Sequence, residues 1–249
     1  MLTASGSAAR TKRPLPAATL ILVDRSKGAP RILMGRRRPD AVFLPDKFVF
    51  PGGRLEAADA DLETTGALAP REAACLLRGL RGLGGDRMAR AFAVAALRET
   101  FEETGYLVAA AGMSGSPPTP APESKVVDLN APDWPELIRR GVRPDLGKLR
   151  YVARAITPPG RPRRYDTRFF LAEAEAVRAV APRTDGELSE IGWFGLDKIS
   201  AYDLPSITRL VLRDLETALT CGQDSEIPFY FWRSGAFRRA LLSQPPGRA

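Results

Sequence analysis

The chain has 249 residues, of which 37 are Lys or Arg, 29 are Asp or Glu and none is His. The absence of His excludes Ser-His-Asp and Cys-His catalysis, so a general base must be a carboxylate, a Lys, a Tyr or an activated water. Because 31 of the basic residues are Arg, the net charge of +8 favours an anionic partner, such as a phosphorylated metabolite, a nucleic acid or a membrane surface. Two cysteines, no long apolar run and no signal-like N-terminus predict a cytoplasmic protein.

The N-terminal part of the chain predicts a flexible tail followed by strands. The tail is residues 1–13, which are small, polar and basic, and strands are expected at 17–24, 31–34 and 48–50. The last of these strands runs directly into Pro51-Gly52-Gly53. A strand that stops at two glycines is expected to bring bare backbone close to another group.

The rest of the chain mixes helices and strands. Residues 60–90 are rich in Gly, Ala and Arg and are interpreted as an insertion, with a short helix at 70–77. A helix is expected at 91–104, closed by Gly105 as a left-handed cap. Further helices are expected at 133–140 and 206–219, strands at 106–108, 151–157, 167–172 and 191–194, and loops at 109–125, 158–164 and 182–190. Hairpin spacing without regular strand-helix alternation favours the α+β class or an α/β sandwich.

Three glutamates fall on one face of the helix expected at 91–104. At about 100° per residue, Glu99, Glu102 and Glu103 share a narrow arc, with Leu97 and Phe101 on the opposite face. Like charges at these spacings cost roughly 0.2–0.5 kcal/mol per pair, and they oppose the helix dipole in the last turn. A solvated acidic face is the usual interpretation of such a run. A divalent cation would remove the repulsion, which favours a metal site here.

Two segments resemble the two halves of the Nudix box. Residues 98–106 read Arg-Glu-Thr-Phe-Glu-Glu-Thr-Gly-Tyr, and residues 50–53 read Phe-Pro-Gly-Gly. The family places a Glu six positions after the second glycine and seven residues before the Arg. In this chain Asp59 stands in place of that Glu, and the 38 residues 60–97 separate it from Arg98. The split box, together with residues 43–45, 52–59 and 156–170, resembles the peroxisomal coenzyme A diphosphatase subgroup of Nudix hydrolases, and the resemblance spans about 15–219.

This resemblance implies a Nudix-type α/β/α sandwich around a mixed sheet. The domain would cover 14–220 with the insertion at 60–90, and residues 221–249 would be a C-terminal extension. The implied reaction is Mg²⁺- or Mn²⁺-dependent hydrolysis of coenzyme A or acyl-coenzyme A to 3′,5′-ADP and the corresponding 4′-phosphopantetheine. ADP-ribose, a dinucleotide or a nucleoside triphosphate are alternative substrates. A non-catalytic nucleotide-binding module is the alternative function.

The resemblance also implies the site residues. Glu99, Glu102, Glu103 and the Gly53 carbonyl would bind the metal, with Glu99 as ligand or general base and Arg98 orienting it. Glu187 or Glu190 would supply a further carboxylate in a late loop. The arginines expected to meet the substrate's phosphates belong to two clusters, 36–38 and 161–164, and the first candidates are Arg36, Arg37, Arg163 and Arg164. The expected partner is therefore a small phosphorylated molecule and neither nucleic acid nor membrane, while no oligomeric state is predicted.

Overall fold

The computed structural model describes residues 12–78, 85–108, 133–179, 186–221 and 226–242. The predicted tail therefore lies almost entirely outside the described residues, as does the loop predicted at 109–125. The centre of the fold is a mixed nine-stranded sheet with the order β11-β10-β6-β7-β1-β2-β3, in which β4 also pairs with β1 and β9 with β2. Its strands are β1 (Leu15–Asp24), β2 (Arg31–Arg37), β3 (Phe48–Val49), β4 (Gly52–Arg54), β6 (Arg150–Ile156), β7 (Tyr165–Glu173), β9 (Leu188–Gly195), β10 (Ile227–Arg233) and β11 (Ala236–Leu242).

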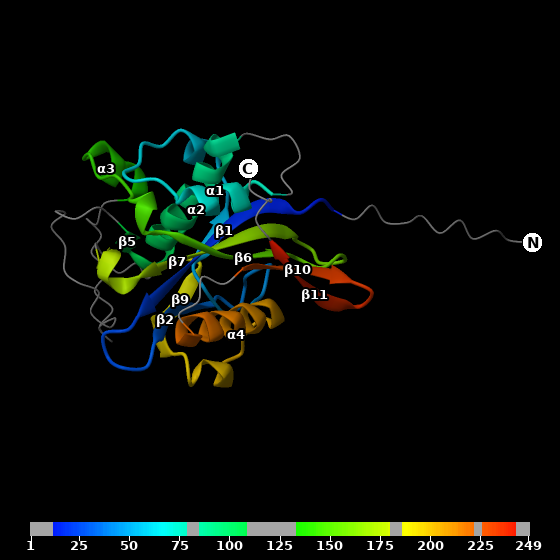
Figure 1. The fold of residues 1–249 in the computed structure, drawn as a ribbon. Coiled ribbons are helices and arrows are strands. Elements are labelled where there is room, and N and C mark those ends of the chain that lie inside the picture. Colours follow the sequence, from blue (N-terminus) through cyan, green and yellow to red (C-terminus); the bar gives the residue numbers. More distant parts are fainter. Residues whose placement is uncertain (1–11, 79–84, 109–132, 180–185, 222–225, 243–249) are drawn as a thin grey trace, which may run out of the picture.

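Helices cover both faces of this sheet. The α-helices are α1 (Pro70–Leu76), α2 (Gly85–Thr104), α3 (Trp134–Arg139) and α4 (Ser206–Cys221), and the 3-10 helices are η1 (Ala57–Ala60), η2 (Leu146–Lys148), η3 (Ala174–Ala176) and η4 (Ile199–Ala201). A separate two-stranded sheet joins β5 (Tyr106–Val108) to β8 (Val177–Ala179). Figure 1 shows α1, α2 and α3 on one side of the large sheet and α4 on the other. The predicted α+β sandwich around a mixed sheet is confirmed.

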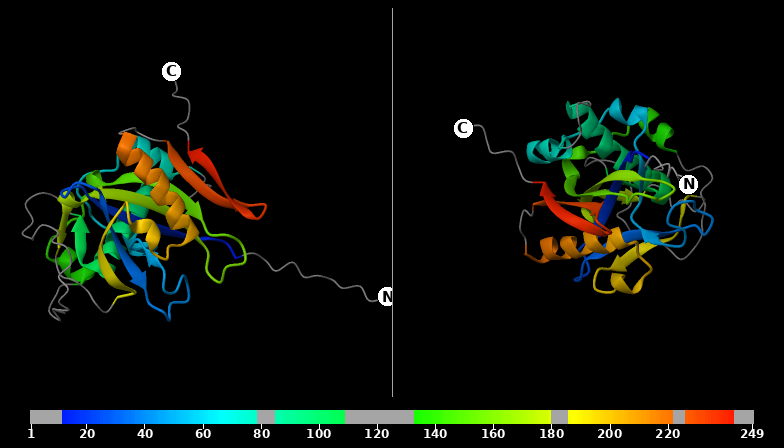
Figure 2. Two further views of the ribbon diagram at one scale, coloured as in Figure 1. Left: turned by 90° about the horizontal axis from the view of Figure 1, so that it is seen from below. Right: turned by 90° about the vertical axis from the view of Figure 1, so that its right-hand side faces the viewer.

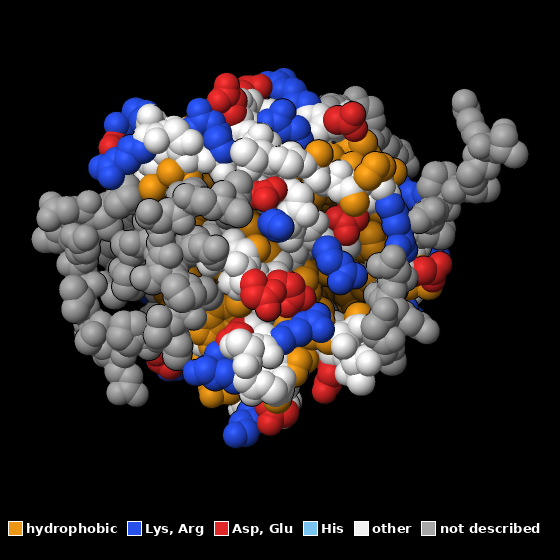
Figure 3. All heavy atoms as spheres, turned by 60° about the vertical axis from the view of Figure 1, so that its left-hand side comes forward, with side chains coloured by type: hydrophobic (Ala, Val, Ile, Leu, Met, Phe, Trp, Pro, Cys, Tyr) orange, Lys and Arg blue, Asp and Glu red, His pale blue; other side chains and the backbone are white. Residues whose placement is uncertain are grey.

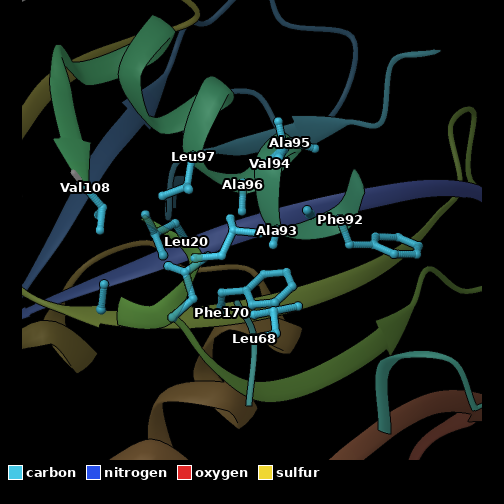
Figure 4. Close-up of a cluster of buried hydrophobic side chains, with 14 of the residues drawn as sticks. Leu20, Leu68, Phe92, Ala93, Val94, Ala95, Ala96, Leu97, Val108 and Phe170 are labelled. Carbon is cyan, nitrogen blue, oxygen red and sulfur yellow. The ribbon is translucent and has the colours of Figure 1, made fainter. Parts of the chain in front are cut away.

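Alternating side chains of the central strands build the two hydrophobic cores. In β1, Leu20 and Leu22 face the core under α2, and Ile21 and Val23 face the core under α4, because successive side chains of a strand point to opposite faces. Figure 4 shows Ala93, Val94 and Ala96 of α2 above Leu20 and Phe170. Small alanines bring the helix close to the sheet, so the end of α2 is held firmly.

Helix α2 begins six residues earlier than the sequence predicts, at Gly85 instead of 91. Residues 85–90 contain two arginines and an aspartate, so their sequence lacks the apolar repeat that marks a helix buried on one face. Ala89 is nevertheless buried in the core. The predicted end is confirmed: Gly105 has φ of 72°, and its N–H donates to the Phe101 carbonyl at 2.7 Å. The helix expected at 70–77 is α1. The region interpreted as an insertion therefore supplies the start of the helix that carries the glutamates.

The segment predicted as a C-terminal extension contributes two strands to the main sheet. Strand β10 pairs in parallel with β6, with Phe229 opposite Arg154, and β11 forms the sheet edge. The Tyr230 hydroxyl, buried at this junction, donates to the Asp214 carboxylate of α4 at 2.5 Å. Figure 2 shows this hairpin alongside α4. The Ser234-Gly235 turn is a local signal for the hairpin that sequence reasoning missed, whereas the parallel pairing of β10 with β6 joins strands that are far apart in the chain. In the described part of the chain, no helix is both long and apolar enough to cross a bilayer.

Candidate active site

A turn of two glycines lies against the C-terminal end of α2. The Gly52 N–H donates to the Glu103 carboxylate at 2.9 Å, and a Cβ on Gly52 would overlap the Ala18 carbonyl of β1. The Glu99 carboxylate lies directly over Gly53, where a Cβ would overlap both of its oxygens. The prediction that the two glycines bring bare backbone close to another group is confirmed, and that group is the pair of glutamates.

Arg98 is the centre of the hydrogen-bond network at this site. Its Nη1 donates to Glu99 and Glu102 at 3.0 Å each, and its Nε and Nη2 donate to the two Asp59 oxygens at 2.9 and 3.1 Å. Nη2 also donates to the Arg54 carbonyl at 3.0 Å. Burial lowers the pKa of Arg98, but the bonds to Asp59 and the charge of Glu99 outweigh burial, and the pKa is raised overall. Arg98 thus connects α2 to β4 and η1.

The role of Asp59 is larger than the sequence suggests. Its side chain is only 2% exposed and, besides its two bonds with Arg98, it accepts the Glu56 N–H at 2.7 Å in the capping box of η1. Asp59 therefore positions Arg98, which in turn positions Glu99 and Glu102. Because 38 residues separate Asp59 from Arg98 in the sequence, no local pattern predicts that the two side chains pair. The available signal was an acidic residue six positions after Gly53.

Burial and mutual repulsion disfavour the charged forms of the three glutamates. Burial raises the pKa of Glu99 to about 7 and that of Glu103 to about 8, and it raises the pKa of Glu102 as well. Glu187 lines the same cleft as Glu99 and Glu102, and its negative charge adds to the upward pKa shifts of Glu99 and Glu103. Of the two late-loop carboxylates that the sequence offers, Glu187 thus shares the cleft with Glu99 and Glu102, whereas Glu190 pairs with Arg36.

These carboxylates suit a hard divalent cation by their chemistry, since Mg²⁺ and Mn²⁺ prefer oxygen ligands and their charge would offset the repulsion. Within the described ranges, however, no three acidic or Cys side chains are already gathered around one point that could hold a metal ion. Arg98 instead binds Glu99 and Glu102, and the Gly52 N–H binds Glu103. The carboxylate oxygens fit a divalent metal ion by their chemistry. To bind one, the glutamates would have to rearrange their present hydrogen bonds with Arg98 and the Gly52 N–H.

The site opens into a cleft of about 1010 Å³. One end is lined by Gly53, Arg98, Glu99 and Glu102, and apolar side chains from several elements form much of the remaining wall. On the face shown in Figure 3, acidic and basic side chains lie next to each other, with hydrophobic side chains exposed between them. The cleft combines cationic side chains with apolar surface, a combination that suits a large amphipathic metabolite.

The cleft receives two of the four arginines that were predicted to bind phosphate. Arg37 and Arg163 line it, and Arg37 pairs with Glu187 at 2.8 Å. Arg36 lies outside the lining and pairs with Glu190 and Asp46 at 2.9 and 3.4 Å. Arg164 also lies outside the lining, where it donates to the carbonyls of Thr157 and Lys12 at 3.1 and 2.7 Å.

Comparisons with curated proteins identify similar sequences in animals, whereas a comparison with models of known protein families finds no match. The chain is 31% identical to the acyl-coenzyme A diphosphatase NUDT19 of Gallus gallus, over 66% of this chain and 52% of that protein. It is 32% identical to the putative nudix hydrolase 7 of Caenorhabditis elegans, over 71% of this chain and 50% of that protein. Identity to human NUDT19 is 30%, over 57% of this chain and 47% of that protein. The chain thus spans about half the length of the curated relatives it matches.

A solved structure provides the same fold over nearly the whole of both chains. The crystal structure of a NUDIX hydrolase from Alicyclobacillus acidocaldarius superposes with a TM-score of 0.59 and 28% sequence identity, covering 84% of this chain and 96% of that one. The shared fold agrees with the split box, whose halves meet at the Gly52-Gly53 turn and the α2 glutamates. The chain belongs to the Nudix hydrolase family.

Proposed function

We propose that this chain hydrolyses the diphosphate linkage of coenzyme A or an acyl-coenzyme A, with Mg²⁺ or Mn²⁺ held by Glu99, Glu102, Glu103 and the Gly53 carbonyl. The observation that carries the proposal is the packing of the glutamate-bearing end of α2 against a two-glycine turn in a cleft that also presents arginines. The names of the chicken and human relatives support the choice of substrate. When bound, such ions neutralise phosphate oxygens and lower the pKa of an attacking water.

In this proposal, different side chains of the cleft accept the proton, position the base and bind the phosphates. Glu99 lines the cleft, and with a pKa of about 7 it suits accepting a proton from water near neutral pH. Arg98 holds that carboxylate in place through the bond from its Nη1. Glu187, which is 71% exposed and paired with Arg37, is the second candidate for the base. Arg37 and Arg163 line the cleft and remain the predicted phosphate ligands, whereas Arg36 and Arg164 lie outside its lining.

Product identification tests this function. Purified protein with Mn²⁺ is expected to convert coenzyme A or an acyl derivative to 3′,5′-ADP and the matching 4′-phosphopantetheine, as detected by mass spectrometry. Excess chelator is expected to remove this turnover, and added Mn²⁺ or Mg²⁺ to restore it, since the carboxylates alone leave the phosphate charge unneutralised. Turnover of ADP-ribose, a dinucleotide or a nucleoside triphosphate, without turnover of coenzyme A, would contradict the proposed choice of substrate. Binding of nucleotides without turnover would indicate the non-catalytic module.

Gly53→Ala is expected to lower kcat about tenfold or more. The added methyl group would displace the Glu99 carboxylate, and misplacement of a reacting group by about 1 Å can cost roughly 100-fold. Gly192→Ala in β9 is the matched control, because its Cβ would make only ordinary contacts of 3.6 Å or more with the Phe194 ring. Steady-state kinetics of both variants measure the effect. Equal activities would show that the close approach of Glu99 to Gly53 is irrelevant to the reaction.

The remaining expectations about partners and location stay predictions. The basic surface is expected to meet the phosphates of a small molecule and no nucleic acid, and the protein is expected to be cytoplasmic.

A further inference from the structure

Half of the six cations that line the cleft already have carboxylate partners. Arg37 pairs with Glu187 at 2.8 Å, and Lys47 pairs with Asp203 at 2.6 Å. Arg98 is shared by Asp59 and two glutamates. Three exposed cleft cations differ: across the described ranges, no ion pair or hydrogen bond engages the side chains of Arg54, Arg161 and Arg163. Two of these three, Arg161 and Arg163, lie on one loop.

That loop, residues 157–164 between β6 and β7, is held by its own hydrogen bonds. The Thr157 N–H donates to the Tyr165 carbonyl at 2.9 Å, and the Tyr165 N–H donates to the Thr157 hydroxyl at 3.0 Å. Arg164 donates to the carbonyls of Thr157 and Lys12, which fastens the loop to the chain ahead of β1. Prolines 158, 159 and 162 further restrict the backbone. Arg164 thus serves the loop itself, while Arg161 and Arg163 line the cleft.

The strand register separates this loop from the glutamates. Gly53, under Glu99, lies opposite Ala18 of β1, whereas Tyr165, at the base of the loop, lies opposite Leu15. Three residues along a strand correspond to about 10 Å. This separation favours a group other than the diphosphate as the ligand of Arg161 and Arg163, since the proposed function places the diphosphate at the glutamates. Arg54 directly follows Gly53 and lies opposite Ala17, which is closer along β1 to the glutamates than the base of the loop is.

We propose that Arg161 and Arg163 bind the 3′-phosphate of the substrate's adenosine moiety, so that the cleft selects coenzyme A over dephospho-coenzyme A. This inference rests on the proposed function. A phosphate monoester carries a charge of about −1.5 to −2 near neutral pH, which two unpaired guanidinium groups match. In coenzyme A one ribose separates this monoester from the diphosphate, which is in keeping with the separation along β1. A loop that is already ordered adds little entropic cost to the binding.

The double variant Arg161→Gln with Arg163→Gln tests the proposal. Its kcat/KM for coenzyme A is expected to fall about tenfold or more, mainly through KM, while kcat/KM for dephospho-coenzyme A changes less than about twofold. The control is Arg25→Gln with Arg87→Gln, which removes the same charge at two exposed ion pairs outside the cleft lining. This control is expected to leave both substrates unaffected at fixed ionic strength.

Binding without turnover gives an independent measurement. By titration calorimetry, the wild-type protein is expected to bind 3′,5′-ADP at least about tenfold more tightly than 5′-AMP, and the double variant to lose that ratio. Equal losses for both substrates, or no loss for coenzyme A, would overturn the assignment, as would equal binding of the two nucleotides by the wild-type protein. If the wild-type protein hydrolyses neither coenzyme, the proposed function fails, and the ratio of nucleotide affinities still decides this inference.

Discussion

Glu99→Gln is expected to lower kcat for the proposed hydrolysis by at least about 100-fold, because loss even of groups that support metal ligands costs about 10- to 100-fold. The expectation holds whether Glu99 binds metal or accepts the proton from water, since an amide does neither well at this position. The fold should persist, because the Gln carbonyl can still accept the bond from Arg98 that Glu99 accepts at 3.0 Å. Single-turnover and steady-state rates with Mn²⁺ measure the loss.

The same variant is expected to be more stable than the wild-type protein in the absence of divalent cations. Burial raises the pKa of Glu99 from 4.5 to about 7, so its contribution to stability is present below pH 4.5 and is lost as pH rises through 7. The melting temperature of Glu99→Gln should therefore exceed that of the wild-type protein at pH 8 and match it near pH 4.5. Glu63→Gln, at an exposed ion pair with Arg143, is the control. A variant that is both active and no more stable would contradict the assignment of Glu99.

Arg98→Met is expected to lower the free energy of unfolding by about 3–5 kcal/mol, which is the usual cost of leaving one member of a buried ion pair unpaired. The side chains of Arg98 and Asp59 are 7% and 2% exposed, so the Asp59 carboxylate has little access to water once Arg98 is removed. Activity should fall with stability, because Glu99 and Glu102 lose the same partner. Urea denaturation measures the loss of stability.

A double-mutant cycle separates the ion pair from general damage. Adding Asp59→Asn to Arg98→Met should recover part of the stability, since no unpaired buried carboxylate remains at that position. Arg87→Met provides the surface comparison, because Arg87 and its partner Asp61 are 66% and 67% exposed, and it should cost less than about 1 kcal/mol. Additive losses in the cycle would show that the Arg98–Asp59 contact contributes little.

The features that the sequence predicts well are those encoded locally. The apolar period of 91–104 and Gly105 predict the helix end, and the 3.6-residue repeat places Glu99 and Glu102 on one face, where both accept bonds from Arg98. The two glycines after the third strand predict a close approach. Each of these patterns needs only neighbouring residues, so one sequence is sufficient.

The features that the sequence does not predict depend on partners distant in the chain or on strand lengths. Strand β2 continues to Arg37 instead of ending at 34, so Arg36 and Arg37 alternate between faces, and only Arg37 lines the cleft. Phe237 reaches the cleft wall because the C-terminal hairpin joins β6, a parallel pairing that no local pattern reveals. The pairing of Asp59 with Arg98 was hidden in the same way by the intervening segment.

This buried pairing of Asp59 with Arg98 has a consequence for how the gene can change. The pair fixes both ends of the segment that separates the two halves of the motif, because Arg98 also binds the Arg54 carbonyl of β4. Insertions between η1 and the start of α2 at Gly85 lie between these anchors but outside the helix, so they can lengthen the protein without moving the glutamates away from the glycine turn. An added residue inside α2 would instead turn the glutamates by about 100° relative to the buried face of the preceding turns. The same feature gives protein engineers a place, between η1 and α2, to insert a peptide tag or a sensor domain.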